Sequence, residues 1–234
     1  MDRRRACMMH VMTKASVIVL RPTRGLSFTE SDQSIDDALQ LAAADGLIHH
    51  DQRRILRTWT QGIPDAFNYL AGAFIRNEGA THAWIVEEDV VVPGLALHVL
   101  LELQADVAAI NYYLKVGGPG RLSELRDPRF GLYSLSTGCL LIRRRVFDEL
   151  PAPWFRTDLC AGLNHAGSSS EGPRPAIVPN TADYGGHDSY FTLRAIQAGY
   201  TVRSARGLLC EHLELERLGR AAANFGCHAI RRVS

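Results

Sequence analysis

The chain has 234 residues, of which 46% are hydrophobic and 22% are charged, proportions that are ordinary for a soluble globular protein. The formal net charge of +1 argues against a broad electrostatic surface for nucleic acid. The longest apolar runs, such as 95–103, are too short to span a bilayer, and no apolar signal-peptide core follows the basic start, so we expect a cytoplasmic protein.

The cysteines agree with that compartment. They are odd in number and include no C-x-x-C pair, namely Cys7, Cys139, Cys160, Cys210 and Cys227. We therefore expect free thiols in a reducing cytoplasm, rather than a disulfide framework or a zinc site.

The first half of the chain alternates between strand and helix patterns. Residues 1–13 are predicted to be a flexible arm, and the β-branched run ASVIVL that follows it predicts a buried strand. In chain order, the expected elements are a strand at 15–20, a helix from Ser31 or Ser34 as its cap to 44, a helix at 63–78, a strand at 83–86, a helix at 93–104 and a strand at 107–112. This alternation predicts an α/β domain with a mostly parallel sheet.

The second half is less regular. Its expected elements are strands at 131–135 and 138–142, a helix at 144–150, a helix at 188–198, a strand at 200–203 and a last helix at 214–225. The stretch 152–186, rich in Gly, Ser and Pro, is too long for a plain connection, which indicates a functional or a mobile segment. Open sheets of this class bind ligands beyond the carboxyl ends of their strands.

An acidic cluster follows the strand predicted at 83–86. Glu87, Glu88 and Asp89 come directly after an apolar run, where buried charge is costly unless something positive answers it. A divalent cation is a natural answer, because hard cations take carboxylate oxygens. Glu87 and Asp89 lie two positions apart and share one side of an extended segment. A solvated acidic turn is the alternative interpretation.

Two further motifs carry titratable groups. Asp188 follows Gly185-Gly186-His187 and begins a predicted helix, where a carboxylate either caps the helix or acts as a general base. His212 follows a predicted strand end, where it either supplies a nitrogen to a metal or is structural.

Small and aromatic residues mark the remaining candidate positions. Thr137 and Gly138 precede a strand and allow the backbone to approach a ligand closely. Trp154 either stacks on the face of a sugar or packs in the core beneath the long segment.

Taken in order, these motifs resemble a bacterial or phage glycosyltransferase of the GT-A fold, similar to the family-2 type, over roughly residues 16–212. The motifs are PT at 22–23, DAFN at 65–68, THAWIVEED at 81–89, TGCLLIR at 137–143, PWF at 153–155, HDSYF at 187–191, AGY at 198–200 and EH at 211–212. The resemblance implies a single domain at 14–213, built on a Rossmann-like, mixed and mostly parallel sheet flanked by helices. Its donor half is at about 14–112 and its acceptor half at about 113–213, with a C-terminal helix or tail at 214–234.

The resemblance also implies roles for individual residues. Glu87 and Asp89 match the outer positions of the D-x-D motif, which holds Mn²⁺ or Mg²⁺ against the diphosphate of a UDP- or GDP-sugar, and His212 completes the metal shell. Asp188 matches the catalytic base. The remaining matches are to the donor pocket for Pro22, Thr23, Asn68 and Glu88, and to the acceptor or sugar for Thr137, Gly138, Trp154 and His187.

Three positions depart from the family pattern. Glu87 replaces the first aspartate of D-x-D, His187 replaces the acid expected before the base, and Phe67 replaces an arginine before the helix asparagine.

The predicted function is metal-dependent transfer of a hexose-like sugar from a nucleotide-diphosphate sugar to a hydroxyl, with inversion and Asp188 as base. The alternatives are a nucleotidyltransferase and a non-catalytic module that binds nucleotide-sugars. The acceptor stays open among a saccharide, a lipid-linked carrier, a peptide, a metabolite and a modified nucleic-acid base.

Overall fold

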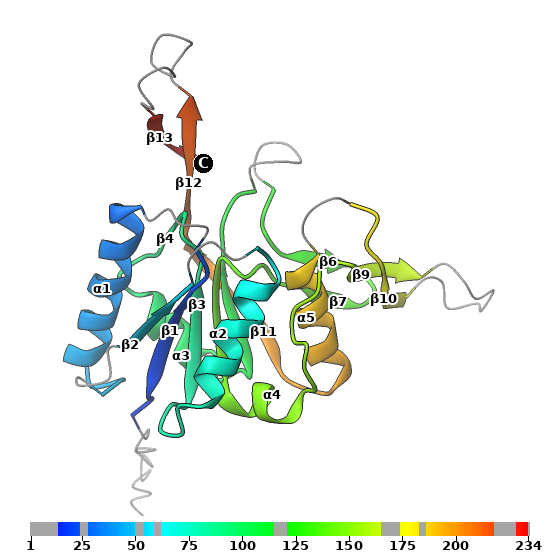
Figure 1. The fold of residues 1–234 in the computed structure, drawn as a ribbon, viewed down its shortest axis with the longest axis horizontal. Helices are drawn as coiled ribbons and strands as arrows, with labels where there is room; N and C mark the ends of the chain where they lie inside the picture. Colours follow the sequence, from blue (N-terminus) through cyan, green and yellow to red (C-terminus); the bar gives the residue numbers. More distant parts are fainter. Residues whose placement is uncertain are drawn as a thin grey trace, which may run out of the picture.

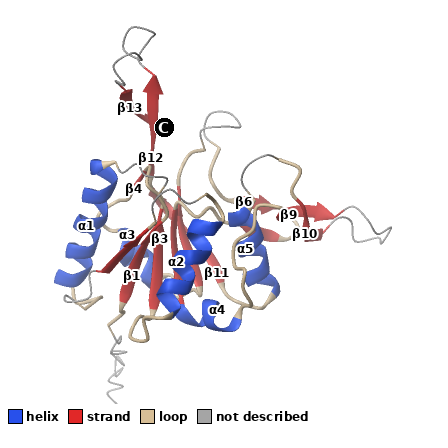
Figure 2. Cartoon of the chain, viewed as in Figure 1, coloured by secondary structure: helices blue, strands red, loops and turns tan. Residues whose placement is uncertain are grey.

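The computed structural model describes residues 14–23, 28–49, 54–58, 62–114, 121–164, 174–182, 186–217 and 228–233, so the arm predicted at 1–13 lies outside them. A central six-stranded sheet runs through the molecule, as Figures 1 and 2 show. Its strands, in spatial order, are β11 (Val202–Leu209), β5 (Val107–Asn111), β8 (Cys139–Arg143), β3 (His82–Val86), β1 (Val17–Arg21) and β2 (Arg54–Arg57).

The sheet is mixed and mostly parallel. β1 pairs in parallel with β2 and with β3, so that Ile18 lies opposite both Arg54 and Ala83. β11 is parallel to β5, whereas β8 runs antiparallel to both of its neighbours, β3 and β5. Because β8 points the other way, its start lies beside the carboxyl end of β3, with Cys139 opposite Val86. The predicted α/β class with a mixed, mostly parallel sheet is confirmed.

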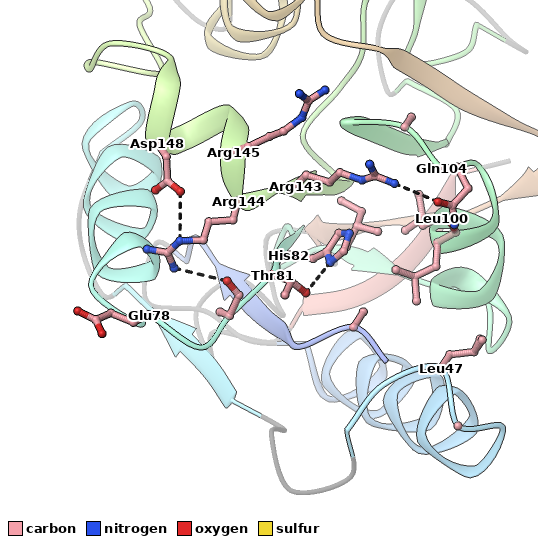
Figure 3. A pocket seen from close by; sticks show the side chains of 16 residues that line it. Leu47, Glu78, Thr81, His82, Leu100, Gln104, Arg143, Arg144, Arg145 and Asp148 are labelled. Atoms are coloured by element: carbon pink, nitrogen blue, oxygen red, sulfur yellow. Dashed lines mark hydrogen bonds and ion pairs between the residues drawn. The ribbon is translucent and has the colours of Figure 1, made fainter. Parts of the chain in front are cut away.

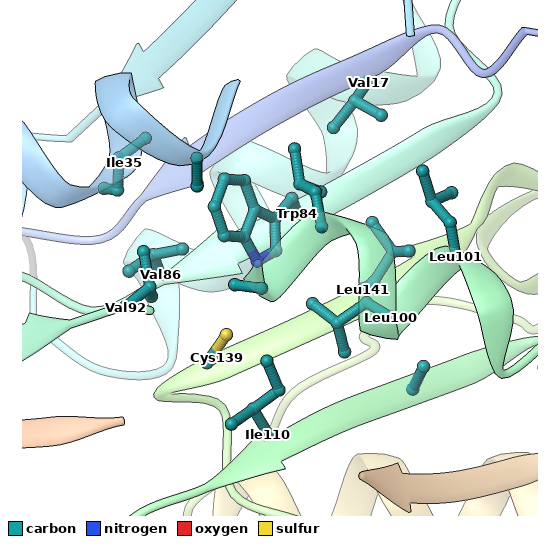
Figure 4. Close-up of a cluster of buried hydrophobic side chains, with 14 of the residues drawn as sticks. Val17, Ile35, Trp84, Val86, Val92, Leu100, Leu101, Ile110, Cys139 and Leu141 are labelled. Carbon is teal, nitrogen blue, oxygen red and sulfur yellow. The ribbon is translucent and has the colours of Figure 1, made fainter. Parts of the chain in front are cut away.

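Helices cover both faces of this sheet. Alternate residues of β3 point to opposite sides. Trp84 and Val86 join the buried cluster that includes α1 (Thr29–Ala44) and α3 (Ala96–Glu102), and Figure 4 shows Trp84 between Ile35 and Leu100. The other cluster lies under three helices, which are α2 (Asp65–Ile75), α4 (Arg144–Glu149) and α5 (His187–Gln197).

Smaller sheets extend from this core. They are β4 (Val90–Val91) with β12 (Glu211–Arg217) and β13 (His228–Val233), β6 (Leu125–Asp127) with β7 (Gly131–Ser134), and β9 (Leu159–Asn164) with β10 (Arg174–Pro179). The helix predicted at 214–225 is therefore wrong at its beginning, because 214–217 belong to strand β12, and 218–225 lie outside the described residues. Part of the stretch 152–186, which was predicted to be functional or mobile, forms the antiparallel pair of β9 and β10.

The serines near the start of α1 do not cap it. The helix begins at Thr29 with no side-chain cap, and Ser31 and Ser34 are buried inside it. The Ser31 hydroxyl donates to the carbonyl oxygen of Val90, and the Ser34 hydroxyl accepts from the backbone N–H of Val92 at 3.0 Å. Both serines therefore fasten α1 to the segment that follows the acidic cluster.

Two other findings concern the expectations on cysteines and membranes. The cysteines in the described part of the chain, Cys139, Cys160 and Cys210, are free thiols. Within the described ranges, none of the helices combines the length and the apolar character that a membrane crossing requires.

Candidate active site

The acidic cluster forms a tight turn at the carboxyl edge of the parallel strands. Glu87 directly follows β3, and the backbone N–H of Val90 donates to the Glu87 carbonyl at 3.2 Å to close the turn. Glu88 and Asp89 are buried, whereas Glu87 is half-buried. The predicted position of these carboxylates at a strand end is therefore the observed one.

A buried arginine supports the turn from behind. Arg21, at the end of β1, has an exposed fraction of 0% and donates to the carbonyl oxygens of Glu87 at 2.7 Å and of Val86 at 3.2 Å. Its guanidinium also pairs with Asp32 at 2.9 Å. Burial lowers the pKa of Arg21, and the Asp32 carboxylate opposes that shift. The sequence did not single out Arg21 as part of the site, although an arginine that ends an apolar strand was the available signal.

His212 meets Asp89 across a strand pair. β12 places His212 opposite Val90, and the backbone N–H of Leu213 donates to the Asp89 carbonyl at 2.7 Å. As a result, His212 Nε2 lies 3.3 Å from Asp89 Oδ2. His212 is 8% exposed, and its Nδ1 is buried without a hydrogen bond among the described residues.

Glu87 belongs to a chain of hydrogen bonds that reaches helix α5. The Thr137 hydroxyl donates to Glu87 Oε1 at 2.6 Å and lies 3.2 Å from His187 Nε2. Because the hydroxyl has only one hydrogen, His187 must donate from Nε2. Burial lowers the pKa of His187, which keeps the ring neutral. Both Thr137 and His187 are buried, so they hold the Glu87 carboxylate from the side of the protein interior.

Tyr112 lies at the centre of these groups. It is 4% exposed, its hydroxyl shares a hydrogen bond with Ser136, and its ring meets that of His212 edge-on at 4.7 Å. Burial raises the pKa of the phenol well above its usual value. Negative charge on three nearby carboxylates raises it further, those of Glu87, Asp188 and Asp89. Tyr112 therefore stays protonated, and the sequence analysis missed it because a tyrosine at a strand end resembles ordinary core.

Gly138 allows this close arrangement. A Cβ atom at this position would lie 2.2 Å from Cε1 of the Tyr112 ring, which no side chain tolerates. The sequence predicted that a ligand approaches the backbone at Gly138. In the structure, the ring of Tyr112 takes that space.

Asp188 lies in the first turn of α5. Gly186, which precedes the helix, has φ of +87°, and a Cβ there would lie 2.8 Å from Asn180 Nδ2. Asp188 is half-buried and accepts from the backbone N–H of Ser189 at 2.7 Å. Its charge is felt at Tyr112, so the carboxylate lies at the same edge as the acidic turn.

The residues predicted to line the donor meet the protein's own backbone. Thr23 is buried, and its N–H donates to the Thr58 hydroxyl at 3.1 Å, which joins the ends of β1 and β2. Pro22 is buried as well, and 24–27 lie outside the described residues. Asn68 accepts from the backbone N–H groups of Trp154 and Phe155 at 2.9 and 3.1 Å, and donates to the Phe155 carbonyl at 2.8 Å.

Trp154 packs on the protein rather than facing the turn. Its indole N–H donates to the Leu150 carbonyl at 2.8 Å, and its ring meets Phe147 of α4 edge-on at 5.5 Å. Helix α4 follows the end of β8 that lies away from the acidic turn. Of the two interpretations left open for Trp154, its contacts favour packing in the core.

The predicted metal ligands are only partly gathered. Asp89 and His212 are in contact, but Glu87 is held by Thr137. Within the described ranges, the structure contains no cluster of three or more His, Cys, Asp or Glu side chains suited to a metal ion.

Comparison with solved structures finds likeness at low sequence identity. The crystal structure of A197 from STIV matches with a TM-score of 0.52 and 14% identity, over 84% of this chain and 84% of that chain. S. aureus TarS matches with a TM-score of 0.46 and 14% identity, over 85% of this chain and 59% of that chain. A glycosyltransferase involved in the glycosylation of the major capsid of PBCV-1 matches with a TM-score of 0.30 and 9% identity, over 59% and 69%.

No protein-family model matches the sequence, and no curated protein matches it either. At these identities the likeness to A197 concerns the fold alone. The likeness agrees with the predicted mixed, mostly parallel sheet flanked by helices.

Proposed function

We propose that this protein is a glycosyltransferase that moves a sugar from a nucleotide-diphosphate sugar to an acceptor hydroxyl. One observation carries the proposal: segments far apart in the chain bring Glu87, Asp89, Asp188 and His212 to the carboxyl edge of the sheet, around the buried phenol of Tyr112. In open α/β sheets this edge is where ligands bind. The ordered sequence motifs and the GT-A type of fold agree with this chemistry.

Asp188 is the proposed base. It lies in the first turn of an 11-residue helix, half-buried at the same edge as the acidic turn. The carboxylate accepts the proton of the acceptor hydroxyl while the hydroxyl oxygen bonds to the anomeric carbon. The diphosphate leaves from the opposite face with the bonding electron pair, so the product is inverted.

Asp89 and His212 are the proposed ligands of a Mg²⁺ or Mn²⁺ ion. Two neighbouring ligands at about 2.1 Å from one octahedral ion lie about 3 Å apart, close to the 3.3 Å that separates Asp89 Oδ2 from His212 Nε2. When bound, such an ion neutralises charge on the leaving diphosphate. Glu87 is proposed as a substrate-facing carboxylate that Thr137 and His187 orient.

The proposed set is narrower than the one that the sequence suggested. Asn68 and Trp154 are left out, because their polar atoms already bond to the backbone of the chain. Pro22 and Thr23 stay as residues near the nucleotide, on the ground of their place at the end of β1.

A donor screen tests the proposal. The protein is incubated with UDP- and GDP-sugars, with Mn²⁺, with Mg²⁺ or with EDTA, and the released nucleoside diphosphate is measured, since slow hydrolysis reports donor use without a known acceptor. We expect release from one donor class, lost in EDTA. In parallel, thermal shifts with nucleoside triphosphates test the nucleotidyltransferase alternative. Stabilisation by triphosphates alone, with no release from any sugar donor, would overturn the proposal.

A further inference from the structure

A cavity of about 700 Å³ lies at the opposite edge of the central sheet from the acidic turn. It is formed where β3 begins, where β8 ends and where α3 ends, and Figure 3 shows its side chains. Its volume falls within the usual range of pockets for small ligands. It is therefore a second candidate site, separate from the proposed donor site.

One part of the cavity wall is hydrocarbon. The apolar lining residues include Ala15, Leu47, Leu100, Leu101, Ala105 and Leu141. Leu47 is only half-buried in the absence of a ligand, so a bound molecule could cover it further. A ligand gains affinity here by placing apolar surface against these side chains.

His82 offers a polar contact beside this apolar wall. Its Nδ1 lies 2.8 Å from the Thr81 hydroxyl, which is closer than the 3.1 Å between that hydroxyl and the Ser16 carbonyl. The Ser16 carbonyl already accepts from the backbone N–H groups of Thr81 and His82. We therefore assign the hydroxyl hydrogen to Nδ1, which puts the ring hydrogen on Nε2, where it can donate to a ligand.

Arg143 is the cation available to a ligand. Arg144 pairs with Asp148 at 3.2 Å, and Arg145 pairs with Asp106 at 2.7 Å. Arg143, in contrast, donates to the neutral amide of Gln104 at 3.1 Å, and no carboxylate of the described residues pairs with it. Arg143 is close enough to His82 for its charge to be felt there. One positive charge and one neutral N–H donor thus meet at the edge of an apolar wall.

We propose that this cavity binds a carboxylate-bearing amphiphile, such as a medium-chain fatty acid. Its carboxylate accepts hydrogen bonds from Arg143 and from His82 Nε2, and its hydrocarbon chain lies against Leu47, Leu100 and Leu101. A single negative charge matches the single available guanidinium, because Arg144 and Arg145 are already neutralised by carboxylates.

Calorimetric titration of the full chain with decanoate, below its micellar concentration, tests this proposal. We expect saturable binding that Arg143→Met weakens about tenfold, the effect of one charge-assisted hydrogen bond. Leu47→Gln should weaken it several-fold, because it replaces half-buried apolar surface without touching the head group. Arg129→Met serves as the matched control, since Arg129 is an exposed arginine outside the cavity and pairs with Asp127. This variant should bind decanoate as the wild type does.

Two further ligands separate the contributions of head group and chain. Decanol keeps the chain without the charge, and inorganic phosphate supplies an anion without a chain, so both should bind at least tenfold more weakly than decanoate. Circular dichroism of each variant confirms that it is folded. The proposal is wrong if decanoate does not saturate, if Arg143→Met binds it unchanged, or if phosphate competes with it fully.

Discussion

A buried or half-buried arginine braces the backbone at each of the two edges of the central sheet. At the carboxyl edge, Arg21 donates to the carbonyl oxygens of Val86 and Glu87 behind the acidic turn. At the amino edge, Arg144 donates to the carbonyl oxygens of Ile75 and Asn77. In both places an arginine holds irregular backbone in position, because its fork of N–H groups reaches several carbonyl oxygens at once.

The edges differ in how their charged groups are partnered. At the amino edge, Asp106 forms a bidentate pair with Arg145 at 2.7 Å and also accepts from Thr201, which is an arrangement for stability. At the carboxyl edge, Glu87 accepts from the hydroxyl of Thr137 at 2.6 Å, and Asp89 lies 3.3 Å from His212. We therefore expect the catalytic groups to lie at the carboxyl edge, and the charged groups of the amino edge to serve stability.

The largest expected effect is a difference in donor turnover between variants of two aspartates, one at each edge of the sheet. Asp188→Asn should lower the release of nucleoside diphosphate from the donor about a thousandfold, because general-base catalysis contributes on that order. Donor binding, measured by thermal shift, should be retained. Asp148→Asn, at the amino edge, should keep wild-type turnover, since Asp148 pairs only with Arg144 among the contacts described for it. Equal losses in both variants would contradict the division.

The next effect compares the two bracing arginines by stability. Arg21→Met should lower the free energy of unfolding by about 4 kcal/mol, because it leaves the buried carbonyl oxygens of Val86 and Glu87 without this donor and removes one of the arginines that pair with Asp32. Arg144→Met should cost less, about 2 kcal/mol, because its side chain is 23% exposed and water can replace it. Urea unfolding of both variants measures the difference, and the reverse order would refute the structural role of Arg21.

Much of the fold could be predicted from sequence because the sheet is built from continuous apolar runs. The strands at 82–86, 107–111 and 139–143 were found within one residue at each end. Strand β2, with the sequence RILR, was missed because it is short and only partly buried. Strand β12 was predicted as helix because its pairing with β13 and β4 is not visible in local periodicity.

The candidate site could be predicted where it consists of titratable side chains at the ends of strands and helices. Glu87, Asp89, Asp188 and His212 stand out as titratable groups at element ends, and the structure brings Asp89 and His212 together. The contribution of Tyr112 depends on tertiary contacts, so no local pattern identifies it, whereas Arg21 could have been noticed as a charge that ends an apolar strand. Asn68 was predicted to contact the donor, and in the structure its amide oxygen accepts from the backbone N–H of Trp154. The sequence around a polar residue on a helix face does not indicate whether it bonds to a ligand or to the chain.

The pH dependence of stability sharpens the description of the amino edge. Burial and the charge of Arg143 lower the pKa of His82 from 6.5 to about 4. As the pH falls below 6.5, the unfolded chain takes up a proton that the folded protein does not, so stability should decrease by about 3 kcal/mol until pH 4 and then level off for this group.

Other charged groups line the same cavity. They are Arg143, Arg144, Arg145, Asp148 and Glu78. A hydrogen bond from Arg145 holds the pKa of Asp106 far below its usual value. The stability that Asp106 contributes is therefore lost only below about pH 4. Burial also lowers the pKa of His187, so that residue contributes in the same direction. Urea unfolding at several pH values should therefore give a slope between pH 6.5 and 4 that His82→Gln reduces. A slope that stays unchanged in that variant would show that His82 is not responsible.

The smallest expected effect tests the hydrogen-bond chain beneath Glu87. Thr137→Val removes the hydroxyl at nearly constant volume, so Glu87 Oε1 loses the donor at 2.6 Å and His187 Nε2 loses its acceptor at 3.2 Å. Donor turnover should fall about tenfold, the equivalent of one hydrogen bond to a charged group. Thr137→Ser should restore it, because serine keeps the hydroxyl. If Thr137→Val and Thr137→Ser turn over the donor equally, Thr137 acts through packing alone, and Glu87 needs no orientation from α5.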